Sequence, residues 1–250
     1  MYIFNENIII IGNSCIKYNI VIPKKVLYTV YWLHGYNGNC FEFYENYDIK
    51  ELSEKYSIAI VTPSVGNNYY IDKYNICISK IVSKNLVDET RYKYDLPNKR
   101  ENTFISGVSM GGYGALLIGS KYASVFGKIA SISGSFIVDD ILIGNPEVVG
   151  YNNCGFSYFS DIFGDLSELE FSYNKNPLCA AIKSLKEHKL PNVFLSCGKE
   201  DILFKRNEKI NKKLIMEGAN VKWYPHNGGH NWRDFAIDET FKWLSSNTHD

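Results

Sequence analysis

Eight short apolar runs, rich in β-branched and aromatic residues, recur along the chain with helix-like segments between many of them. Each run is bounded by Gly, Asn or Pro and predicts a β-strand: NIIIIGN, CIKYNIVIP, LYTVYWLHG, SIAIVTP, NTFISGV, KIASISG, NVFLSCG and VKWYP. Apolar residues three and four apart predict helices over Ile49–Tyr56, Ile76–Tyr92, Gly111–Tyr122, Ile202–Glu217 and Trp232–Leu244. This alternation predicts an α/β fold with a mostly parallel central sheet and helices on both faces.

The connections between these segments refine the predicted fold. The first two runs are joined by GNS, which is too short for a crossover helix, so we expect an antiparallel hairpin at the N-terminal edge of the sheet. The 250 residues, 45% of them apolar, are enough for one large core, and we expect a single domain over residues 1–250. The least regular stretch, residues 136–176, mixes aromatic residues with Asn, Gly and Asp. We interpret it as an insertion near the substrate site, with a plain surface excursion as the alternative.

Charge and composition exclude several classes of function. Lys plus Arg and Asp plus Glu both number 27, so no global field favours nucleic acid or an anionic membrane as a partner. The N-terminus lacks the pattern of a signal peptide, and no run approaches the roughly 18 apolar residues that span a bilayer, which predicts a cytoplasmic protein. The six cysteines form no CxxC pair, and we expect no disulfide, metal or cofactor.

The segment ISGVSMGGYGA places Ser109 among four glycines. It could be a flexible loop, a phosphate-binding turn, or a strained corner that exposes the serine hydroxyl. A dinucleotide-binding turn requires G-x-G-x-x-G, and Leu117 stands where the third glycine belongs. A flexible loop has no room between the predicted strand and helix. The pattern therefore indicates a G-x-S-x-G nucleophile elbow, with Gly107 and Gly111 where the backbone passes too close for side chains.

A serine nucleophile requires a base and an acid that holds the base. In this fold they follow the serine in the order acid, then histidine, each after a strand. Asp201 follows NVFLSCG and is the predicted acid, with Glu200 as the alternative; Asp201 could also merely cap the next helix. His230, after a Gly-Gly turn, is the predicted base, with His226 as the alternative. The glycines between the two histidines oppose a metal-binding pair.

Two backbone amides are needed to stabilise the negative charge that develops on a carbonyl oxygen during attack. One is predicted to be the N–H of Met110, directly after the serine. The second is predicted in the loop HGYNGN, from Tyr36 or, as the alternative, Gly35. His34 in the same loop is expected to support the loop by hydrogen bonding.

Four stretches, LHGYNGN, GVSMGGYGA, CGKED and GGHNW, resemble in order and separation the family that includes esterase D, S-formylglutathione hydrolase, tributyrin and acetyl esterases and feruloyl esterases. The resemblance runs from about Cys15 to Leu244. It implies an α/β-hydrolase fold and metal-free hydrolysis of small-molecule esters. The roles it implies for the serine, aspartate, histidine and two amides are those named above. Family similarity also favours a homo-oligomer.

Within this family, HGYNGN is more similar to the tributyrin and acetyl esterases than to the S-formylglutathione hydrolases. The resemblance implies esters of short acyl groups, including carbohydrate-linked esters, or feruloyl esters. NNYYID resembles a loop that walls the acyl pocket, so Tyr69 and Tyr70 are expected to contact substrate, together with Gly35 and, in the insertion, Phe159. The alternatives are an S-formylglutathione hydrolase, an acyltransferase of the same fold, and a catalytically silent binding module.

Overall fold

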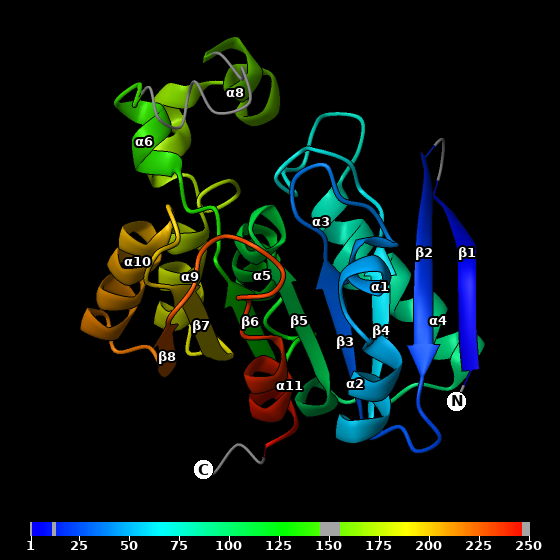
Figure 1. Cartoon of the computed structure of the whole chain (residues 1–250). Helices are drawn as coiled ribbons and strands as arrows, with labels where there is room; N and C mark the ends of the chain where they lie inside the picture. The colour runs from blue at the N-terminus through cyan, green and yellow to red at the C-terminus, as the bar shows by residue number, and fades with distance from the viewer. Residues whose placement is uncertain (1, 12–13, 146–155, 247–250) are drawn as a thin grey trace.

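The computed structural model describes residues 2–11, 14–145 and 156–246, and its centre is a sheet with the strand order β1-β2-β4-β3-β5-β6-β7-β8 (Figure 1). All eight predicted strands are present. Their bounds are β1 Tyr2–Ile11, β2 Ser14–Ile22, β3 Tyr28–Leu33, β4 Ile58–Pro63, β5 Thr103–Val108, β6 Lys128–Ile132, β7 Asn192–Gly198 and β8 Val221–His226.

Strand direction matches the prediction of a mostly parallel sheet with an antiparallel edge. β1 and β2 pair antiparallel, and β2 in turn pairs antiparallel with β4. From β4 through β8 every neighbouring pair is parallel. The carboxyl ends of β5, β7 and β8 therefore meet at one edge, where the loops that follow them carry the predicted serine, acid and base.

The sheet is covered on both faces, and alternate residues of β3 show why. Val30 and Trp32 pack into one hydrophobic core, whereas Tyr31 and Leu33 pack into the other. The first core is closed by α1 Glu42–Asn46, α2 Ile49–Tyr56 and α11 Ile237–Ser245 (Figure 1). The second is closed mainly by η1 Ile81–Asn85, α4 Leu86–Tyr94, α5 Met110–Lys121, α9 Pro177–Lys186 and α10 Phe204–Met216. Burial on both faces explains the nearly continuous apolar runs of the central strands.

Four of the five predicted helices match to within two residues at each end, the second as the run α3 Ile78–Lys80, η1 and α4. The prediction is wrong at the start of the last helix, because α11 begins at Ile237 and not at Trp232. Residues 231–236 form turns instead: the Asn231 carbonyl accepts from the N–H groups of Asp234 and Phe235, and the Asp234 carboxylate accepts from the Gly229 N–H at 2.7 Å.

Helix α9 was not predicted from the sequence. Asn176 caps it by accepting from the Leu178 N–H, and Pro177 occupies its first turn, both of which are ordinary start signals. Its buried face, however, consists largely of small residues such as Ala180, Ala181 and Ser184. Small residues allow close packing against α5 but give a weak apolar pattern.

The stretch 136–176 is more regular than expected. It contains the helices α6 Val138–Leu142, α8 Phe156–Phe163 and η4 Leu166–Phe171, and Figure 1 shows α6 and α8 beyond the end of the sheet. Residues 146–155, which include Tyr151 and Cys154, lie outside the described residues. The shortness of these helices explains why no periodicity was detected.

A partly buried ion pair joins α6 to α10. The Arg206 guanidinium donates to both oxygens of the Asp140 carboxylate, at 2.6 and 2.7 Å. Burial alone would raise the pKa of Asp140, but the hydrogen bonds and positive charge of Arg206 outweigh burial and lower it below the ordinary value of 3.8. The stabilisation from Asp140 is therefore present above pH 3.8 and is lost as the pH falls through its folded-state pKa.

Replacing Arg206 by methionine is expected to reduce the free energy of unfolding by about 2 to 4 kcal/mol at pH 7, because it leaves a carboxylate buried without its partner. The loss should shrink at pH 3, where Asp140 becomes protonated in the variant. Urea unfolding at both pH values measures the difference. The control is Lys209→Met, which removes the exposed pair with Asp139 and should cost less than about 1 kcal/mol. An equal loss at both pH values would contradict the charge argument.

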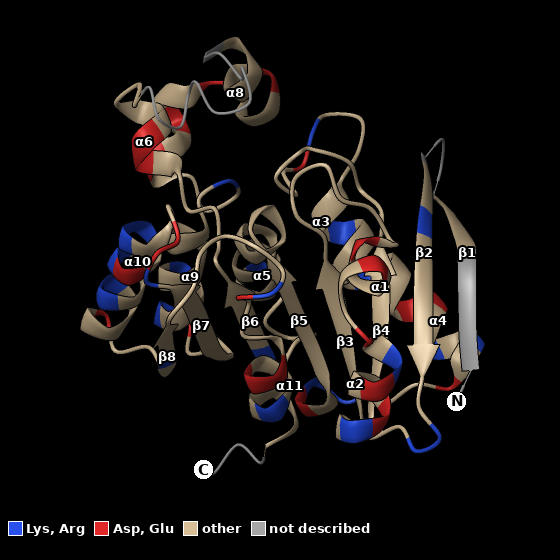
Figure 2. Cartoon of the chain, in the orientation of Figure 1, with Lys and Arg blue, Asp and Glu red and all other residues tan. Residues whose placement is uncertain are grey.

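Charge is distributed over the helices with both signs interspersed, whereas the central strands carry almost none (Figure 2). Lys128 is the one charged residue within β3 to β7, and its ammonium group donates to three carbonyls at the end of α11. Among the residues that the structure describes, no helix is both long enough and apolar enough to cross a bilayer.

Candidate active site

Ser109 lies at the corner between β5 and α5, in a backbone conformation that side chains rarely adopt. Its φ is 54° and its ψ is −116°. The Ser109 N–H donates to the Ile132 carbonyl of the neighbouring strand at 2.9 Å, which ties the corner to β6. A non-glycine residue in this region costs about 1 to 3 kcal/mol and persists only where its surroundings enforce it. This backbone conformation directs the Ser109 side chain out of the sheet.

The glycines on each side of Ser109 are required by close backbone contacts, as predicted. A Cβ atom on Gly107 would lie 2.6 Å from backbone atoms of Gly111 and from the Leu33 carbonyl oxygen. A Cβ atom on Gly111 would lie 2.0 Å from the same Leu33 oxygen. Both distances are far below van der Waals contact. Strand β3 and helix α5 can therefore approach the corner only because these two side chains are absent.

The three residues predicted from the order rule lie in one hydrogen-bonded line. The Ser109 Oγ is 3.0 Å from His230 Nε2, and His230 Nδ1 is 2.8 Å from Asp201 Oδ2. A carboxylate only accepts, so Nδ1 carries the proton and donates to Asp201, and Nε2 accepts from the serine hydroxyl. In this arrangement the imidazole can remove the serine proton.

Asp201 is held as an ionised acceptor. Its side chain is completely buried, and burial would raise its pKa, but the His230 hydrogen bond and charge, with the Leu203 N–H and the Ser133 hydroxyl, outweigh burial and lower the pKa. The Leu203 N–H donates to Oδ1 at 2.7 Å. Oδ1 therefore holds the turn that leads into α10, whose N-cap residue is Leu203, and Oδ2 faces His230.

The alternatives Glu200 and His226 are placed elsewhere. The Glu200 carboxylate accepts from the Gly228 N–H in the loop that precedes His230. The His226 Nδ1 donates to the Asn227 carbonyl at 2.9 Å, and its ring packs against Tyr224. Neither side chain has a contact with Ser109. Among the described residues, no group of three or more His, Cys, Asp or Glu side chains could hold a metal ion.

The loop after β3 lies against the nucleophile. A Cβ atom on Gly35 would lie 3.8 Å from the Ser109 Cβ, so Tyr36, the next residue, begins beside the serine. The Met110 N–H belongs to the first turn of α5, where N–H groups have no partner within the helix and favour negative charge. The loop and the helix terminus therefore bring both predicted oxyanion donors close to Ser109.

The Gly35–Tyr36 peptide is held by two donors to its carbonyl. The Gly35 oxygen accepts from His34 Nδ1 at 2.7 Å and from the Gly38 N–H at 3.1 Å. The His34 Nε2 in turn accepts from the Val65 N–H at 3.2 Å. Because burial lowers the pKa of His34, the ring stays neutral with both nitrogens used. In a trans peptide the N–H points away from the carbonyl, so these bonds also set the direction of the Tyr36 N–H.

His34 supports this loop as predicted, and Glu42 is a second supporting residue, which was not predicted from the sequence. The Glu42 carboxylate, on α1, accepts from the Gly35 N–H at 2.8 Å. Burial raises the pKa of Glu42, and the hydrogen bond from Gly35 opposes this shift. Gly35 is thus fixed on its N–H side by Glu42 and on its carbonyl side by His34.

Comparison with known proteins shows the family of this chain. The model of the esterase family described as "Putative esterase" matches residues 13–242. The chain belongs to this esterase family. An acetyl esterase of Caldicellulosiruptor saccharolyticus is 34% identical over 236 residues, which cover 92% of this chain and 87% of that protein. The protein is therefore a serine carboxylic ester hydrolase with the α/β-hydrolase fold.

Solved structures similar to this esterase share its fold. An S-formylglutathione hydrolase of Staphylococcus aureus superposes with a TM-score of 0.80 at 21% identity, and 93% of each chain is covered. A fluorophosphonate-binding serine hydrolase of the same organism gives a TM-score of 0.82 at 20% identity, again with 93% of each chain covered. At these sequence identities, the similarity to the two structures establishes a shared fold and nothing more.

Tyr70, which is predicted to contact substrate, is fully buried in the structure. Its side chain is 0% exposed, its hydroxyl donates to the His34 carbonyl at 3.0 Å, and its ring fills the space left by the missing side chain of Gly114. Tyr70 therefore supports the loop that carries His34 and Gly35. Its backbone is left-handed, with φ of 60°.

Tyr69 and Phe159 belong to an aromatic cluster between α5 and α8. Tyr69 is 7% exposed and packs edge-on against Tyr113, and Phe159 is 3% exposed and stacks on Phe163. Next to them the ring of Tyr158 meets Tyr36 edge-on, with 6.1 Å between the ring centres. Helix α8, in the predicted insertion, thus contacts the loop that carries the proposed oxyanion donor.

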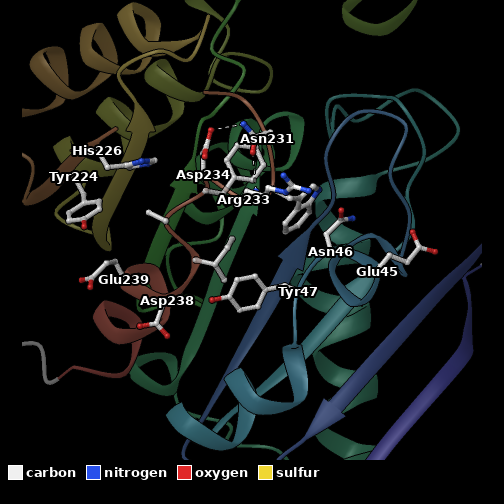
Figure 3. Close-up of a pocket in the computed structure, with 14 residues that line it drawn as sticks. Glu45, Asn46, Tyr47, Tyr224, His226, Asn231, Arg233, Asp234, Asp238 and Glu239 are labelled. Atoms are coloured by element: carbon white, nitrogen blue, oxygen red, sulfur yellow. Dashed lines mark hydrogen bonds between the residues drawn. The ribbon is translucent and has the colours of Figure 1, made fainter. Parts of the chain in front are cut away.

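An open groove of about 1110 Å³ lies beside the loop that follows His230 (Figure 3). It runs between the end of α1, strand β8 and residues 231–239. Figure 3 shows Asn231 hydrogen-bonded to Asp234, the Arg233 side chain extending toward Asn46, and Tyr47 close to Asp238. Phe235 lines the groove and also packs edge-on against the His230 ring at 5.4 Å. The loop 231–235 therefore separates the groove from the imidazole.

Sequence reasoning missed the turn after β6. The Ser135 Oγ lies 3.1 Å from the Ser109 Oγ, and the Ser133 hydroxyl contacts the Asp201 carboxylate. A usable signal was present, because the segment SGS follows a buried parallel strand that neighbours β5. Polar residues at that end of such a strand commonly contribute to the site of an α/β fold.

Proposed function

We propose that this esterase hydrolyses short-chain acyl esters of small alcohols, with Ser109 as nucleophile, His230 as general base and Asp201 as the carboxylate that orients it. The observation that carries the proposal is the continuous hydrogen-bond line from Ser109 Oγ through His230 to Asp201, at 3.0 and 2.8 Å. The similarity to an acetyl esterase supports a preference for short acyl groups.

Acylation follows from this geometry. His230 Nε2 takes the proton of Ser109 as Oγ bonds to the ester carbonyl carbon, and the carbonyl electron pair moves onto its oxygen. The N–H groups of Met110 and Tyr36 donate to that oxygen. When the tetrahedral carbon collapses, the C–O bond to the alcohol breaks and His230 returns the proton to the leaving oxygen. Asp201 remains ionised throughout and holds the Nδ1–H tautomer.

Deacylation repeats these steps with water. His230 removes a proton from the water as its oxygen bonds to the acyl carbon, and the Ser109 Oγ leaves with the proton that His230 then returns. An alcohol in place of water would make the enzyme an acyltransferase. The aromatic cluster around Tyr69 and Phe159, with the backbone of Gly35, is proposed to shape the acyl side of the site, because it adjoins the Tyr36 loop.

The test is labelling with a fluorophosphonate, followed by mass mapping of the modified peptide. We expect one phosphonyl group on the peptide that contains Ser109, and competition by short-chain esters such as p-nitrophenyl acetate. Hydrolysis across a series of acyl lengths should decline with increasing length. Labelling at another serine would overturn the nucleophile assignment. Faster turnover of S-formylglutathione than of any simple ester would replace the proposed substrate class.

A further inference from the structure

The turn after β6 is tied directly to the nucleophile elbow. Its central residue, Ser133, has a left-handed φ of 47°, which bends the chain back toward β5. Two backbone hydrogen bonds connect the turn and the elbow: the Ser109 N–H donates to the Ile132 carbonyl at 2.9 Å, and the Ser135 N–H donates to the Ser109 carbonyl at 3.0 Å. The positions of Ser109 and Ser135 are therefore fixed relative to each other by backbone.

The turn is also clamped from the opposite side by Asn207. The Asn207 side chain is fully buried and accepts from the Gly134 N–H at 3.0 Å. Its amide donates to the Gly134 carbonyl at 2.9 Å and to the Leu203 carbonyl at 3.0 Å. Leu203 follows the loop of Asp201, so the same amide links the β6 turn to the loop that holds the acid.

The β6 turn, held by these hydrogen bonds, places the Ser135 hydroxyl beside the Ser109 hydroxyl. The two Oγ atoms are 3.1 Å apart, and Ser135 is 7% exposed. Since the Ser109 proton is directed to His230 Nε2, the Ser109 oxygen can act toward Ser135 only as an acceptor. The Ser135 hydroxyl must then be the donor. It occupies one of the two lone pairs of the Ser109 oxygen and leaves the other for attack.

We propose that Ser135 is a further catalytic residue of this esterase, whose hydroxyl donates to Ser109 Oγ and stabilises that oxygen while its bond to hydrogen is broken. The proposal rests on the proposed function of Ser109. Ser135 keeps its own proton throughout: the Ser109 proton passes to His230, and the oxygen lone pair forms the bond to the acyl carbon. In deacylation the same hydrogen bond stabilises Ser109 Oγ as it leaves.

The proposal makes a prediction that a purely structural role or a substrate contact does not. Because Ser109 Oγ is nucleophile in one step and leaving group in the other, Ser135→Ala should slow both steps by a similar factor. One hydrogen bond to an oxygen that gains charge corresponds to a loss of about ten-fold in each. Substrate affinity should not change, because Ser135 contacts the enzyme oxygen and not the substrate.

The experiment measures acylation and deacylation rate constants with p-nitrophenyl acetate by stopped flow, together with the rate of fluorophosphonate labelling. For Ser135→Ala we expect all three rates to fall about ten-fold, with unchanged apparent affinity and unchanged melting temperature. Ser135→Thr, which retains the hydroxyl, should recover rates to within about three-fold of the original. The matched control is Ser131→Ala, since Ser131 lies in β6 and its buried hydroxyl has no hydrogen-bond partner within the described part of the chain.

Each outcome decides the proposal. Rates equal to those of the unmodified enzyme would overturn it. A loss confined to deacylation or to certain acyl groups would also overturn it, and would assign Ser135 to water or substrate instead. A loss that Ser135→Thr does not recover would also overturn it. Failure of the proposed function gives a different result, in which Ser109→Ala itself still hydrolyses esters.

Discussion

Replacing Ser109 by alanine is expected to lower kcat/KM by a factor on the order of 10⁵ to 10⁶, because no acyl-enzyme can form without its oxygen. The backbone strain at this position predicts a second effect. Ser109→Gly should be equally inactive yet more stable by about 1 kcal/mol, since glycine adopts φ of 54° without the strain that serine carries. Initial rates with p-nitrophenyl acetate and urea unfolding measure the two effects.

The matched control for this serine is Ser106→Ala, three residues earlier on β5, the strand that leads to Ser109. Ser106 is buried, and its hydroxyl has no hydrogen-bond partner among the described residues, so its removal should leave kcat/KM within about two-fold. Ester hydrolysis by Ser109→Ala above about one per cent of the original rate would place the nucleophile elsewhere, because loss of a covalent nucleophile costs far more than a hundred-fold.

Replacing Asp201 by asparagine is expected to lower kcat about 10⁴-fold at neutral pH while the fold is retained. An amide can present its N–H₂ group to His230 Nδ1, which favours the tautomer with the proton on Nε2. That nitrogen then faces Ser109 as a donor and cannot take its proton. Stopped-flow kinetics should show that acylation and deacylation both slow, since each step depends on the removal of a proton by His230 Nε2.

The neighbouring acid provides the control. Glu200→Gln retains an oxygen that can accept from the Gly228 N–H, and we expect less than a ten-fold loss of kcat. Because the pKa of Asp201 lies below 3.8 in the folded protein, the carboxylate stays ionised through the whole range in which an imidazole titrates. Assays at neutral pH therefore measure the enzyme with Asp201 ionised. A larger loss from Glu200→Gln than from Asp201→Asn would reverse the assignment of the acid.

Much of the fold could be predicted from local pattern because the central strands are buried on both faces. Burial on both faces requires unbroken apolar runs, such as SIAIVTP and NVFLSCG, and these are readable without any knowledge of the partner strands. The positions of Asp201 and His230 were predictable for a related reason: parallel strands end at one edge, so the order of strands also orders the residues that meet there.

Features that depend on contacts between distant segments were not predictable. Helix α9 presents small residues to α5, and a small-residue face is recognised only when its partner helix is known. Tyr70 looked like a pocket residue, but the missing side chain of Gly114, more than 40 positions away, gives its ring a buried site. Glu42 and Ser135 reach the catalytic centre from helices and turns that carry no motif of their own.

The amino-acid sequence by itself determined the α/β class, the glycine-lined corner at Ser109 and the aspartate and histidine that lie beside it, because strand burial, close backbone contact at glycine and chain order are all local or topological properties. The tertiary structure alone decided which oxygen of Asp201 faces His230, how His34 and Glu42 orient the Gly35 peptide, and that the Ser135 hydroxyl lies beside the Ser109 hydroxyl. Those are hydrogen bonds between segments far apart in the chain. Their geometry is set by how whole elements pack, to within fractions of an ångström, and no spacing of residues encodes it.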